Sequence, residues 1–326
     1  MKRVQCVKVH HSYDGIRDAV HDLSLTINAG EVLALIGPNG AGKSTTLRIL
    51  ATLQQPDQGS VTWDGQDAWA DRLELRQRIG FLGDGTGLYP TMTASGYLQF
   101  FAECYGQGDV EARARVRELL EIFSLTKKAN ARISDLSKGM RQRLAIARTL
   151  IHRPELLLLD EPADGLDPRA RRQLREILRK VADDGVALVV SSHILRELDG
   201  FCDTVAVIQK GRLEVHGPVE DVIQKYEVGR RLHEVQVTRG LQKALEILRA
   251  HEGLIEHVGP LHKSETMEDP TTADRGLIRV RIHGNEERAA HLLRELVLAD
   301  VEVIELAKVR SDLEDVYSSL GRDAVA

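Results

Sequence analysis

The sequence predicts an α/β fold, and three observations lead to this class. The segment Gly37-Pro38-Asn39-Gly40-Ala41-Gly42-Lys43-Ser44 lies between the apolar run 32–36 and a stretch with helical spacing of leucine and isoleucine. Four consecutive leucines at 156–159 are typical of a central parallel strand that is covered on both faces. Between Thr93 and His152 the apolar residues recur at three- and four-residue spacing. We therefore expect a phosphate-loop (P-loop) NTPase core with an inserted helical subdomain at about 93–152.

The loop at 37–44 has the residue types that bind phosphate. Glycines let the backbone curl so that successive N–H groups point at phosphate oxygens, and the helix that starts near Lys43 turns its positive end to the same place. We expect Lys43 to reach the β- and γ-phosphates and the Ser44 hydroxyl to bind Mg²⁺. A glycine turn that matched by chance would lack the flanking strand and helix. The residues expected to contact the nucleotide here are Gly37, Pro38, Asn39, Gly40, Ala41, Gly42, Lys43, Ser44 and Thr45.

Composition narrows the class of protein further. The 326 residues are 42% hydrophobic and 29% charged, which suits one large domain and a smaller one. The net charge of −5 gives no reason to expect a nucleic-acid partner. No apolar run approaches the roughly 20 residues that cross a bilayer, and the first residues do not form a signal-peptide core. Cys6, Cys104 and Cys202 are far apart and indicate free thiols in a reducing compartment. We expect a cytosolic protein.

The first elements form an antiparallel subdomain. Residues 4–10 and 20–27 alternate apolar and polar side chains, which indicates two strands. The loop between them carries one aromatic residue, Tyr13. It is either an ordinary surface tyrosine or a platform for the nucleotide base, a contact worth about 1–3 kcal/mol.

The remaining elements of this part of the chain follow in order. Further strands are expected at 60–63, 79–82, 186–190, 204–208 and 212–216. Helices are expected at 93–105, 109–123, 138–151, 168–183 and 219–226. The stretch from Gly83 to Gly87 is rich in glycine and too irregular for either.

Two acidic residues follow the leucine strand. Asp160 suits a ligand of Mg²⁺, and Glu161 suits a base that polarises the attacking water. The alternative is a solvated acidic turn, which the phosphate loop upstream disfavours. His193 follows the strand at 186–190. A lone histidine is usually structural, but at the carboxyl end of a strand in such a sheet it is a candidate for a contact to the γ-phosphate.

The segment 227–326 has a different pattern. Strands are expected at 232–237, 254–258, 277–282 and 301–309, and helices at 241–250, 286–298 and 312–320, with a flexible polar loop at 263–274. The order βαββαβ predicts a small α+β domain of the ferredoxin-like kind, which by itself indicates no function.

These motifs together resemble the ATP-binding subunits of ABC transporters, over about residues 2–226. Leu136-Ser137-Lys138-Gly139-Met140 is similar to the family's signature segment, and Asp160-Glu161-Pro162 to its extended Walker B motif. The segment 163–167 is similar to the D-loop, which places Asp167 near the nucleotide. His193 stands where the switch histidine is expected, and Tyr13 where the base-stacking aromatic is expected.

The resemblance implies a site shared between two chains. In this family Ser137 and Gly139 hold the γ-phosphate of the partner's nucleotide, so two copies pack head to tail around two ATP. Hydrolysis at Glu161 then releases the dimer, because ATP contacts both chains only in the closed state.

Two departures from the family pattern stand out. Asp84 takes the place of the usual glutamine after the strand at 79–82, and we expect this carboxylate to keep a role on the metal side. Lys138 and Met140 replace the usual glycine and glutamine of the signature segment. This variant and the C-terminal extension look like the ABC-2 export group, which includes sodium-extrusion and antibiotic-resistance ATPases.

The function that the resemblance implies is ATP hydrolysis coupled to export. The chain would act as a homodimer, or beside a paired ATPase subunit, on the cytoplasmic face of the cell membrane, and a separate transmembrane permease would carry the substrate. The alternatives are a soluble ABC ATPase acting on ribosomes or DNA, and a regulator that binds nucleotide without hydrolysis. The single phosphate loop and the acidic net charge disfavour the first. The presence of Asp160, Glu161 and His193 disfavours the second.

Overall fold

The computed structural model describes residues 1–83, 85, 87–193, 200–227, 230–251, 254–259, 274–283 and 286–308. The chain divides into two compact units, Met1–Val219 and Glu220–Ala326. This division assigns helix α7 (Val219–Glu227) to the second unit, whereas the sequence places the boundary after residue 226. The helix expected at 312–320 and all but the last residue of the loop expected at 263–274 lie outside the described residues.

A six-stranded sheet forms the centre of the first unit, in the order β10-β9-β3-β8-β7-β6. Strands β3, β6, β7, β8 and β9 pair in parallel, and β10 joins the edge through an antiparallel hairpin. All four leucines of β7 are fully buried, as expected for a strand covered on both faces. The strands span Val32–Ile36 (β3), Ile79–Leu82 (β6), Leu156–Leu159 (β7), Ala187–Ser192 (β8), Thr204–Gln209 (β9) and Arg212–Pro218 (β10).

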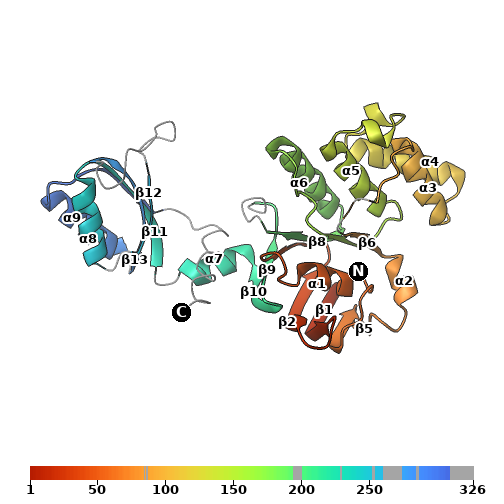
Figure 1. Ribbon diagram of the computed structural model, residues 1–326, viewed down its shortest axis with the longest axis horizontal. Helices are drawn as coiled ribbons and strands as arrows, with labels where there is room; N and C mark the ends of the chain where they lie inside the picture. Colours follow the sequence, from red (N-terminus) through yellow and green to blue (C-terminus); the bar gives the residue numbers. More distant parts are fainter. Residues whose placement is uncertain are drawn as a thin grey trace. The chain divides into compact units, whose positions relative to one another are not determined.

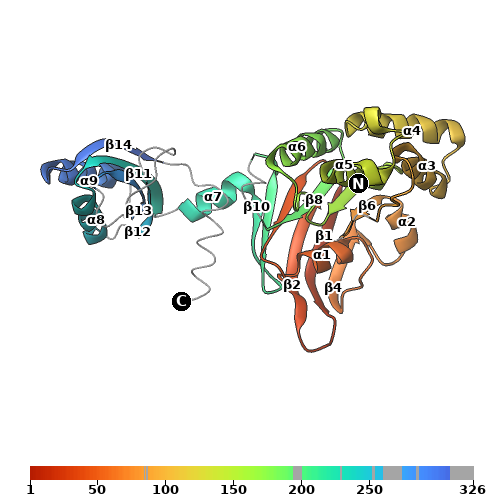
Figure 2. The same ribbon diagram turned by 45° about the horizontal axis from the view of Figure 1, so that its top comes forward.

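A second, antiparallel sheet has the order β2-β1-β4-β5, and helix α1 (Lys43–Leu50) lies between it and the central sheet (Figures 1 and 2). Leu47 and Leu50 of α1 share one core cluster with residues of both sheets. Leu156 and Leu158 face this cluster, so by strand alternation Leu157 and Leu159 face the opposite side. The strands span Arg3–Ser12 (β1), Asp18–Asn28 (β2), Gln58–Trp63 (β4) and Gln66–Asp67 (β5).

Helices α3 to α6 lie on the opposite side of the central sheet. Figure 1 shows α6 and the helical block α3–α5 on the side of the sheet away from α1. Helix α6 begins where Asp167 accepts the backbone N–H of Ala170 and Pro168 takes the first helical position, a combination that favours a helix start. The bounds are Ala94–Cys104 (α3), Asp109–Ile122 (α4), Lys138–Thr149 (α5) and Pro168–Asp183 (α6), with single 3₁₀ turns at Thr126–Lys128 and Ile133–Asp135.

One helix of this unit, α2 (Arg72–Arg76), is absent from the sequence prediction. Asp71 caps it by accepting the backbone N–H of Glu74. An Asp followed three residues later by Glu is a capping pattern that marks a helix start. With five residues, α2 is too short for the spacing of its apolar residues to predict it.

The second unit contains a four-stranded antiparallel sheet in the order β12-β13-β11-β14. The elements follow one another as strand, helix, strand, strand, helix, strand, in the order expected from sequence. Leu245 of α8 and Leu292 of α9 pack in one core cluster with Val235 and Ile278 of the sheet. The bounds are Arg230–Arg239 (β11), Leu241–Ala250 (α8), Leu254–Gly259 (β12), Gly276–His283 (β13), Glu286–Leu298 (α9) and Glu302–Lys308 (β14).

Among the described residues, no helix has the length and apolar character that crossing a membrane requires.

One ion pair ties β6 to β7 at their amino ends. Arg78 donates two hydrogen bonds to Glu155, from Nε to Oε1 at 2.7 Å and from Nη2 to Oε2 at 2.9 Å. These bonds, together with the contact of the Met1 ammonium, lower the pKa of Glu155 to about 2. The carboxylate is 37% exposed, so solvent screening limits what the pair adds to stability.

We expect Glu155→Gln to lower the free energy of unfolding by about 1 kcal/mol at pH 7. Because the pKa is depressed in the folded protein, this contribution is present above the ordinary carboxyl pKa and is lost as pH falls toward 2. The measurement is denaturant unfolding of wild type and variant at pH 7 and pH 3, followed by the fluorescence of Trp63 and Trp69, both in the first unit. A stability difference that stays constant between the two pH values would contradict the assignment.

Candidate functional site

The phosphate loop connects the carboxyl end of β3 to the start of α1, as the sequence predicts. A Cβ at Gly37 would lie 2.3 Å from the carbonyl oxygen of Ile208, and one at Gly42 would lie 2.4 Å from that of Ala19. Gly42, the residue before α1, also has a φ of +105°. Both positions therefore require glycine, and the loop packs directly on β9 and β2.

Lys43 is the buried cation of this loop. Its ammonium donates to the carbonyl oxygens of Gly37 at 2.7 Å and Pro38 at 3.2 Å, and it lies 3.3 Å from Oε1 of Glu161. The side chain is only 5% exposed. A buried charge needs such partners, so the loop carbonyls and Glu161 together hold the ammonium at the amino end of α1.

The two acidic residues lie at the carboxyl end of β7. The Ser191 hydroxyl, on the neighbouring strand β8, donates to Oδ1 of Asp160 at 2.7 Å and accepts the backbone N–H of Glu161 at 2.8 Å. Asp160 is buried, and its backbone N–H donates to the Leu82 carbonyl. Glu161 has a φ of +45°, a left-handed conformation that residues other than glycine rarely adopt. Ser191 thus fixes both acids.

Ser191 has no role in the sequence prediction, which expects the strand to end at residue 190. Strand β8 instead runs to Ser192, and Ser191 is fully buried. The adjacent parallel pairing of β7 with β8 brings its hydroxyl to the acids. The available signal was a serine directly after the strand predicted at 186–190.

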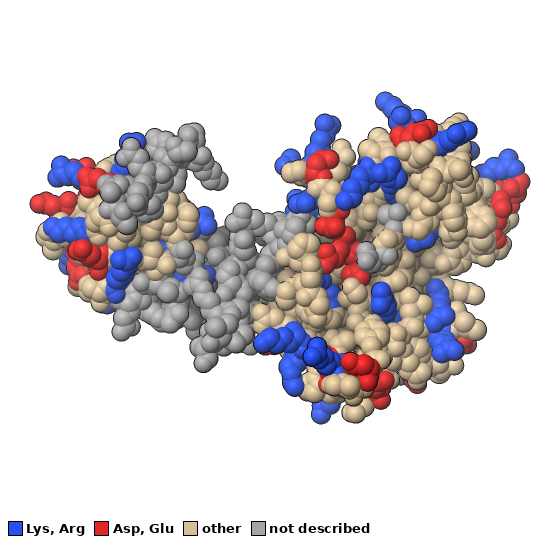
Figure 3. Space-filling view, viewed as in Figure 1, with Lys and Arg blue, Asp and Glu red and all other residues tan. Residues whose placement is uncertain are grey.

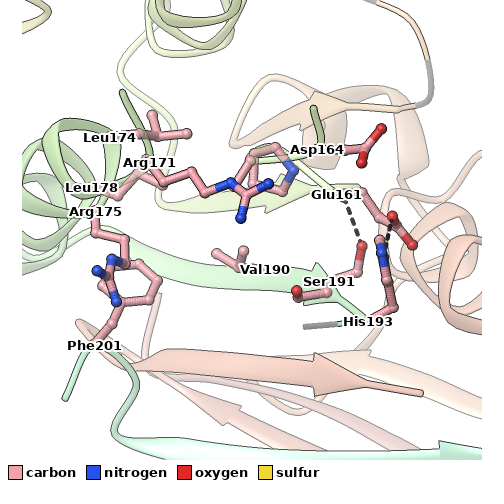
Figure 4. A pocket seen from close by; sticks show the side chains of 13 residues that line it. Glu161, Asp164, Arg171, Leu174, Arg175, Leu178, Val190, Ser191, His193 and Phe201 are labelled. Carbon is pink, nitrogen blue, oxygen red and sulfur yellow. Dashed lines mark hydrogen bonds and ion pairs between the residues drawn. The ribbon is translucent and has the colours of Figure 1, made fainter. Parts of the chain in front are cut away.

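His193 lies directly after β8 and contacts the second acid. Its Nδ1 is 2.8 Å from Oε2 of Glu161, and Figure 4 shows the two side chains turned toward each other. The same figure shows Leu174, Leu178 and Phe201 around a small apolar cavity beside them. That cavity has a volume of about 30 Å³, too little for a nucleotide.

A wider cleft of about 510 Å³ borders both the phosphate loop and the acids. The cleft is lined by both polar and apolar residues and is open to solvent. Oxygen donors of the kind that Mg²⁺ prefers come from Ser44 and Asp160, which therefore fit such an ion. The lining residues are Ser44, Leu82, Gly83, Gly85, Lys138, Gln142, Asp160, Glu161 and Asp164. Asp84 lies outside the described residues.

The signature segment forms the start of α5. Ser137 caps the helix by accepting the backbone N–H of Met140, and Gly139 lies close to α6, where an added Cβ would be 3.2 Å from Cβ of Ala170. Ser137 and Gly139 are not among the residues that line the cleft with Glu161. The Lys138 ammonium lies against Gly165, where a Cβ would be 1.9 Å from it. The signature segment thus contacts the expected D-loop of its own chain.

Two other predicted site residues have structural partners. The Tyr13 hydroxyl is 3.2 Å from Oγ1 of Thr45, which places this exposed ring beside the start of α1. Asp167 is the cap of α6 described above. Their roles toward a nucleotide stay predictions.

The chain is similar to known proteins over most of its length. The ABC transporter family profile matches residues 20–164. The ABC transporter ATP-binding protein NatA of Bacillus subtilis strain 168 is 43% identical over 207 residues, which cover 63% of this chain and 84% of that protein. A Nod factor export ATP-binding protein I of Burkholderia lata is 38% identical and covers 66% and 70%. The daunorubicin resistance ATP-binding protein DrrA3 of Streptomyces coeruleorubidus is 32% identical over 309 residues, or 95% of this chain and 93% of that protein.

Solved structures with the same fold include an ATP-binding subunit of an ABC transporter, with a TM-score of 0.61 and 28% identity over 68% of this chain and 92% of that chain. A bacterial ABC transporter cassette solved as a dimer has a TM-score of 0.60 and 28% identity, covering 66% and 98%. The family resemblance drawn from the motifs is confirmed. The chain belongs to the ABC transporter family, as an ATP-binding subunit that hydrolyses ATP.

Proposed function

We propose that this chain powers export through a separate membrane-spanning subunit, by closing and opening a head-to-tail dimer around two ATP. The observation that carries the proposal is the cluster of Lys43, Asp160, Glu161 and His193 at one edge of the central sheet. The names of the similar Nod factor export and drug resistance proteins support the direction of transport. We further propose that the dimer works at the cytoplasmic face of the cell membrane.

In this proposal the chain's own residues bind the phosphates of ATP and orient and deprotonate the attacking water. The backbone N–H groups of residues 39–45 and the Lys43 ammonium hold the phosphates. Ser44 and Asp160 would hold Mg²⁺, with Asp84 contributing on the same side, and the ion would supply positive charge to neutralise the phosphates. Glu161 takes a proton from water as the water oxygen bonds to the γ-phosphorus and the bond to the ADP oxygen breaks. His193 stays beside Glu161 and contacts the γ-phosphate.

Because Lys43 pairs with Glu161, ATP binding can control whether Glu161 is free to act as the base. The ammonium lies 3.3 Å from Glu161, and a γ-phosphate carries more negative charge than a carboxylate. Phosphate therefore takes over the ammonium when ATP binds, and Glu161 is released to accept a proton. The base becomes free only when its substrate is in place.

The signature segment acts in the partner's site. Ser137 and Gly139 lie at the amino end of α5, where a helix favours an anion, yet they do not line the cleft that holds their own chain's acids. In this proposal another copy supplies the phosphate that they contact. A similar cassette is dimeric in its solved structure, which supports this arrangement.

Substitution of Tyr13 tests whether this residue stacks on the adenine base of ATP. We expect Tyr13→Ala to weaken ATP binding by about 1–3 kcal/mol, roughly 5- to 150-fold in Kd, because the stacking surface is lost. Tyr13→Phe keeps the ring and loses only the hydroxyl beside Thr45, so its affinity should stay near wild type. Titration of both variants with a fluorescent ATP analogue checks this. If Tyr13→Ala and wild type bind the ATP analogue with equal affinity, Tyr13 is an ordinary surface residue.

The surface that meets the membrane subunit is proposed to be the stretch after β6 and the start of the helical block. Two aromatic side chains stand exposed there, Tyr89 at 48% and Phe100 at 42%, with ring centroids 6.3 Å apart. The Tyr97 hydroxyl beneath them donates to the Gly87 carbonyl, which ties α3 to the glycine-rich stretch. Exposed aromatic residues that touch one another are typical of interaction surfaces.

Purification of the tagged chain from native membranes in mild detergent tests the proposed function. We expect a polytopic membrane protein to co-elute in stoichiometric amount. A Tyr89→Ser, Phe100→Ser variant should lose this partner and still bind ATP, whereas Val110→Ser, an exposed control on α4, should keep it. Recovery of the soluble protein alone, or with ribosomes, would replace the transporter assignment with a soluble ATPase. The face seen in Figure 3 mixes basic and acidic side chains, which does not favour nucleic acid.

We also propose that residues 1–226 form an ATP-binding domain that contains a helical subdomain at about 93–152. Residues 227–326, which follow it in the sequence, form a ferredoxin-like accessory domain. The strand order β12-β13-β11-β14 supports the fold type. The similarity to DrrA3 extends over 95% of the chain, so it includes much of this region.

A further inference from the structure

A cluster of potential metal ligands lies on β1 and β2, outside the ATP site. Within the described residues, His10, Asp18 and His21 each offer a ligand atom, and these atoms all lie within 4.8 Å of one another. The rings of His10 and His21 meet edge to face, with centroids 4.5 Å apart. Nδ1 of His21 is 2.6 Å from Oδ2 of Asp18. The only other such group among these residues, Glu161, Asp164 and His193, belongs to the catalytic cleft.

An irregularity in the β1–β2 pairing brings the three side chains together. Val9 pairs with Leu23 and His11 pairs with Val20, so two residues of β2, His21 and Asp22, stand opposite His10 alone. This is a β-bulge, and Asp22 has the left-handed φ of +52° that fits it. A further register shift follows between His11 and Ser12. In a regular strand Asp18 and His21 would point to opposite faces, and the bulged strand turns both toward His10.

The donor set selects the chemical class of the metal. Two imidazole nitrogens and one carboxylate oxygen suit Zn²⁺, Ni²⁺ or Cu²⁺, whereas Mg²⁺ and Ca²⁺ prefer oxygen donors throughout. Three protein ligands leave a coordination position for water. The side chains of His21 and Asp18 are 30% and 44% exposed, so an ion can reach them from solvent. The Asp18 contact orients the His21 ring before any ion arrives.

We propose that His10, Asp18 and His21 form a binding site for a divalent transition metal, with Zn²⁺ as the best fit, that fastens β1 to β2. The site adjoins the phosphate loop through the residues between its ligands. The Ala19 carbonyl oxygen lies 2.4 Å from where a Cβ of Gly42 would be. The His21 backbone N–H donates to the Gly211 carbonyl, and the Gly211 N–H donates to the Ala41 carbonyl. The bound ion holds in place the segment of β2 that packs on Gly42.

Zinc binding measured by competition with a chromophoric chelator tests the site. We expect wild type to bind one equivalent more Zn²⁺ than His10→Ala, His21→Ala, since the catalytic cleft is unchanged in both proteins. Asp18→Asn keeps the shape of the side chain and loses its charge, and should weaken this equivalent at least about tenfold. His257→Ala removes an exposed histidine elsewhere and should bind as wild type does.

Two further readouts separate a built site from loose surface binding. Zn²⁺ should raise the melting temperature of wild type more than that of His10→Ala, His21→Ala, because the variant lacks one folded site that the ligand would stabilise. Co²⁺ added in place of Zn²⁺ should give stronger visible absorption in wild type than in this variant. Equal Zn²⁺ stoichiometry in wild type and in a variant with unchanged circular dichroism would overturn the proposal. If the double variant does not fold, the comparison of wild type with Asp18→Asn decides in the same way.

Discussion

Replacing Lys43 by alanine should abolish productive ATP binding, with a loss of affinity of about 100-fold or more. The ammonium is almost fully buried in the loop, within 3.3 Å of Glu161 and hydrogen-bonded to two loop carbonyls. No other described cation donates to these carbonyls. The alanine variant therefore removes the central positive charge of the phosphate site and leaves Glu161 without its ion pair.

Equilibrium binding of a fluorescent ATP analogue in the presence of Mg²⁺ measures this loss. Lys127→Ala, which removes an exposed lysine from a 3₁₀ turn of the helical block, is the matched control and should bind normally. Near-normal affinity in Lys43→Ala would refute the assignment of the loop as the nucleotide site. Circular dichroism of the variant distinguishes lost binding from lost folding.

Replacing Glu161 by glutamine should separate binding from hydrolysis. The amide keeps the shape of the side chain but cannot take a proton from water, so we expect hydrolysis to fall by about 10²–10⁴-fold while ATP still binds. Since ATP contacts both chains only in the closed state, the variant should accumulate as a dimer with ATP and not with ADP. Steady-state phosphate release and size-exclusion chromatography measure the two effects.

Glu155→Gln provides the control for this experiment. It makes the same substitution at the amino end of the same strand, beside Arg78 and away from the cleft. Its hydrolysis rate per folded molecule should equal that of wild type. A Glu161→Gln protein that stays monomeric with ATP would undercut the shared site, and one that hydrolyses at the normal rate would remove Glu161 from the role of base.

The parts of the fold that follow from local pattern were predictable. The leucine strand, the phosphate loop and α6 can each be predicted from a few neighbouring residues. The signals are the apolar run, the glycine spacing and the helix cap, and all three are local in the sequence. The ends of strands are harder to predict, because the β-propensity of a residue does not tell which strand it pairs with. Strand β8 continues to Ser192 because it pairs with β3, where Leu35 lies opposite Ser191 and Ile36 opposite Ser192. The bridge of Ser191 between Asp160 and Glu161 depends on the pairing of β8 with its other neighbour, β7.

The less predictable features are contacts between distant segments. Nothing in the residues around Lys138 indicates that its ammonium rests on Gly165. The β-bulge opposite His10 likewise depends on how two strands align, and a regular alternation would have placed Asp18 and His21 apart. Motif spacing identified the chemistry of the site, whereas the arrangement of the side chains that hold it required the structure.

The most direct test of the central claim is a disulfide between the phosphate loop of one chain and the signature segment of another. The protein would carry Asn39→Cys and Ser137→Cys together with Glu161→Gln, with serine at Cys104 and Cys202. Cys6 can stay, because it is buried and burial raises the pKa of its thiol to about 12. The proposed dimer predicts a crosslinked pair of chains that forms with ATP and not with ADP, with neither cysteine alone, and not when Lys43→Ala is added. No crosslink with ATP, or an equal yield without nucleotide, would contradict a nucleotide site shared between two copies.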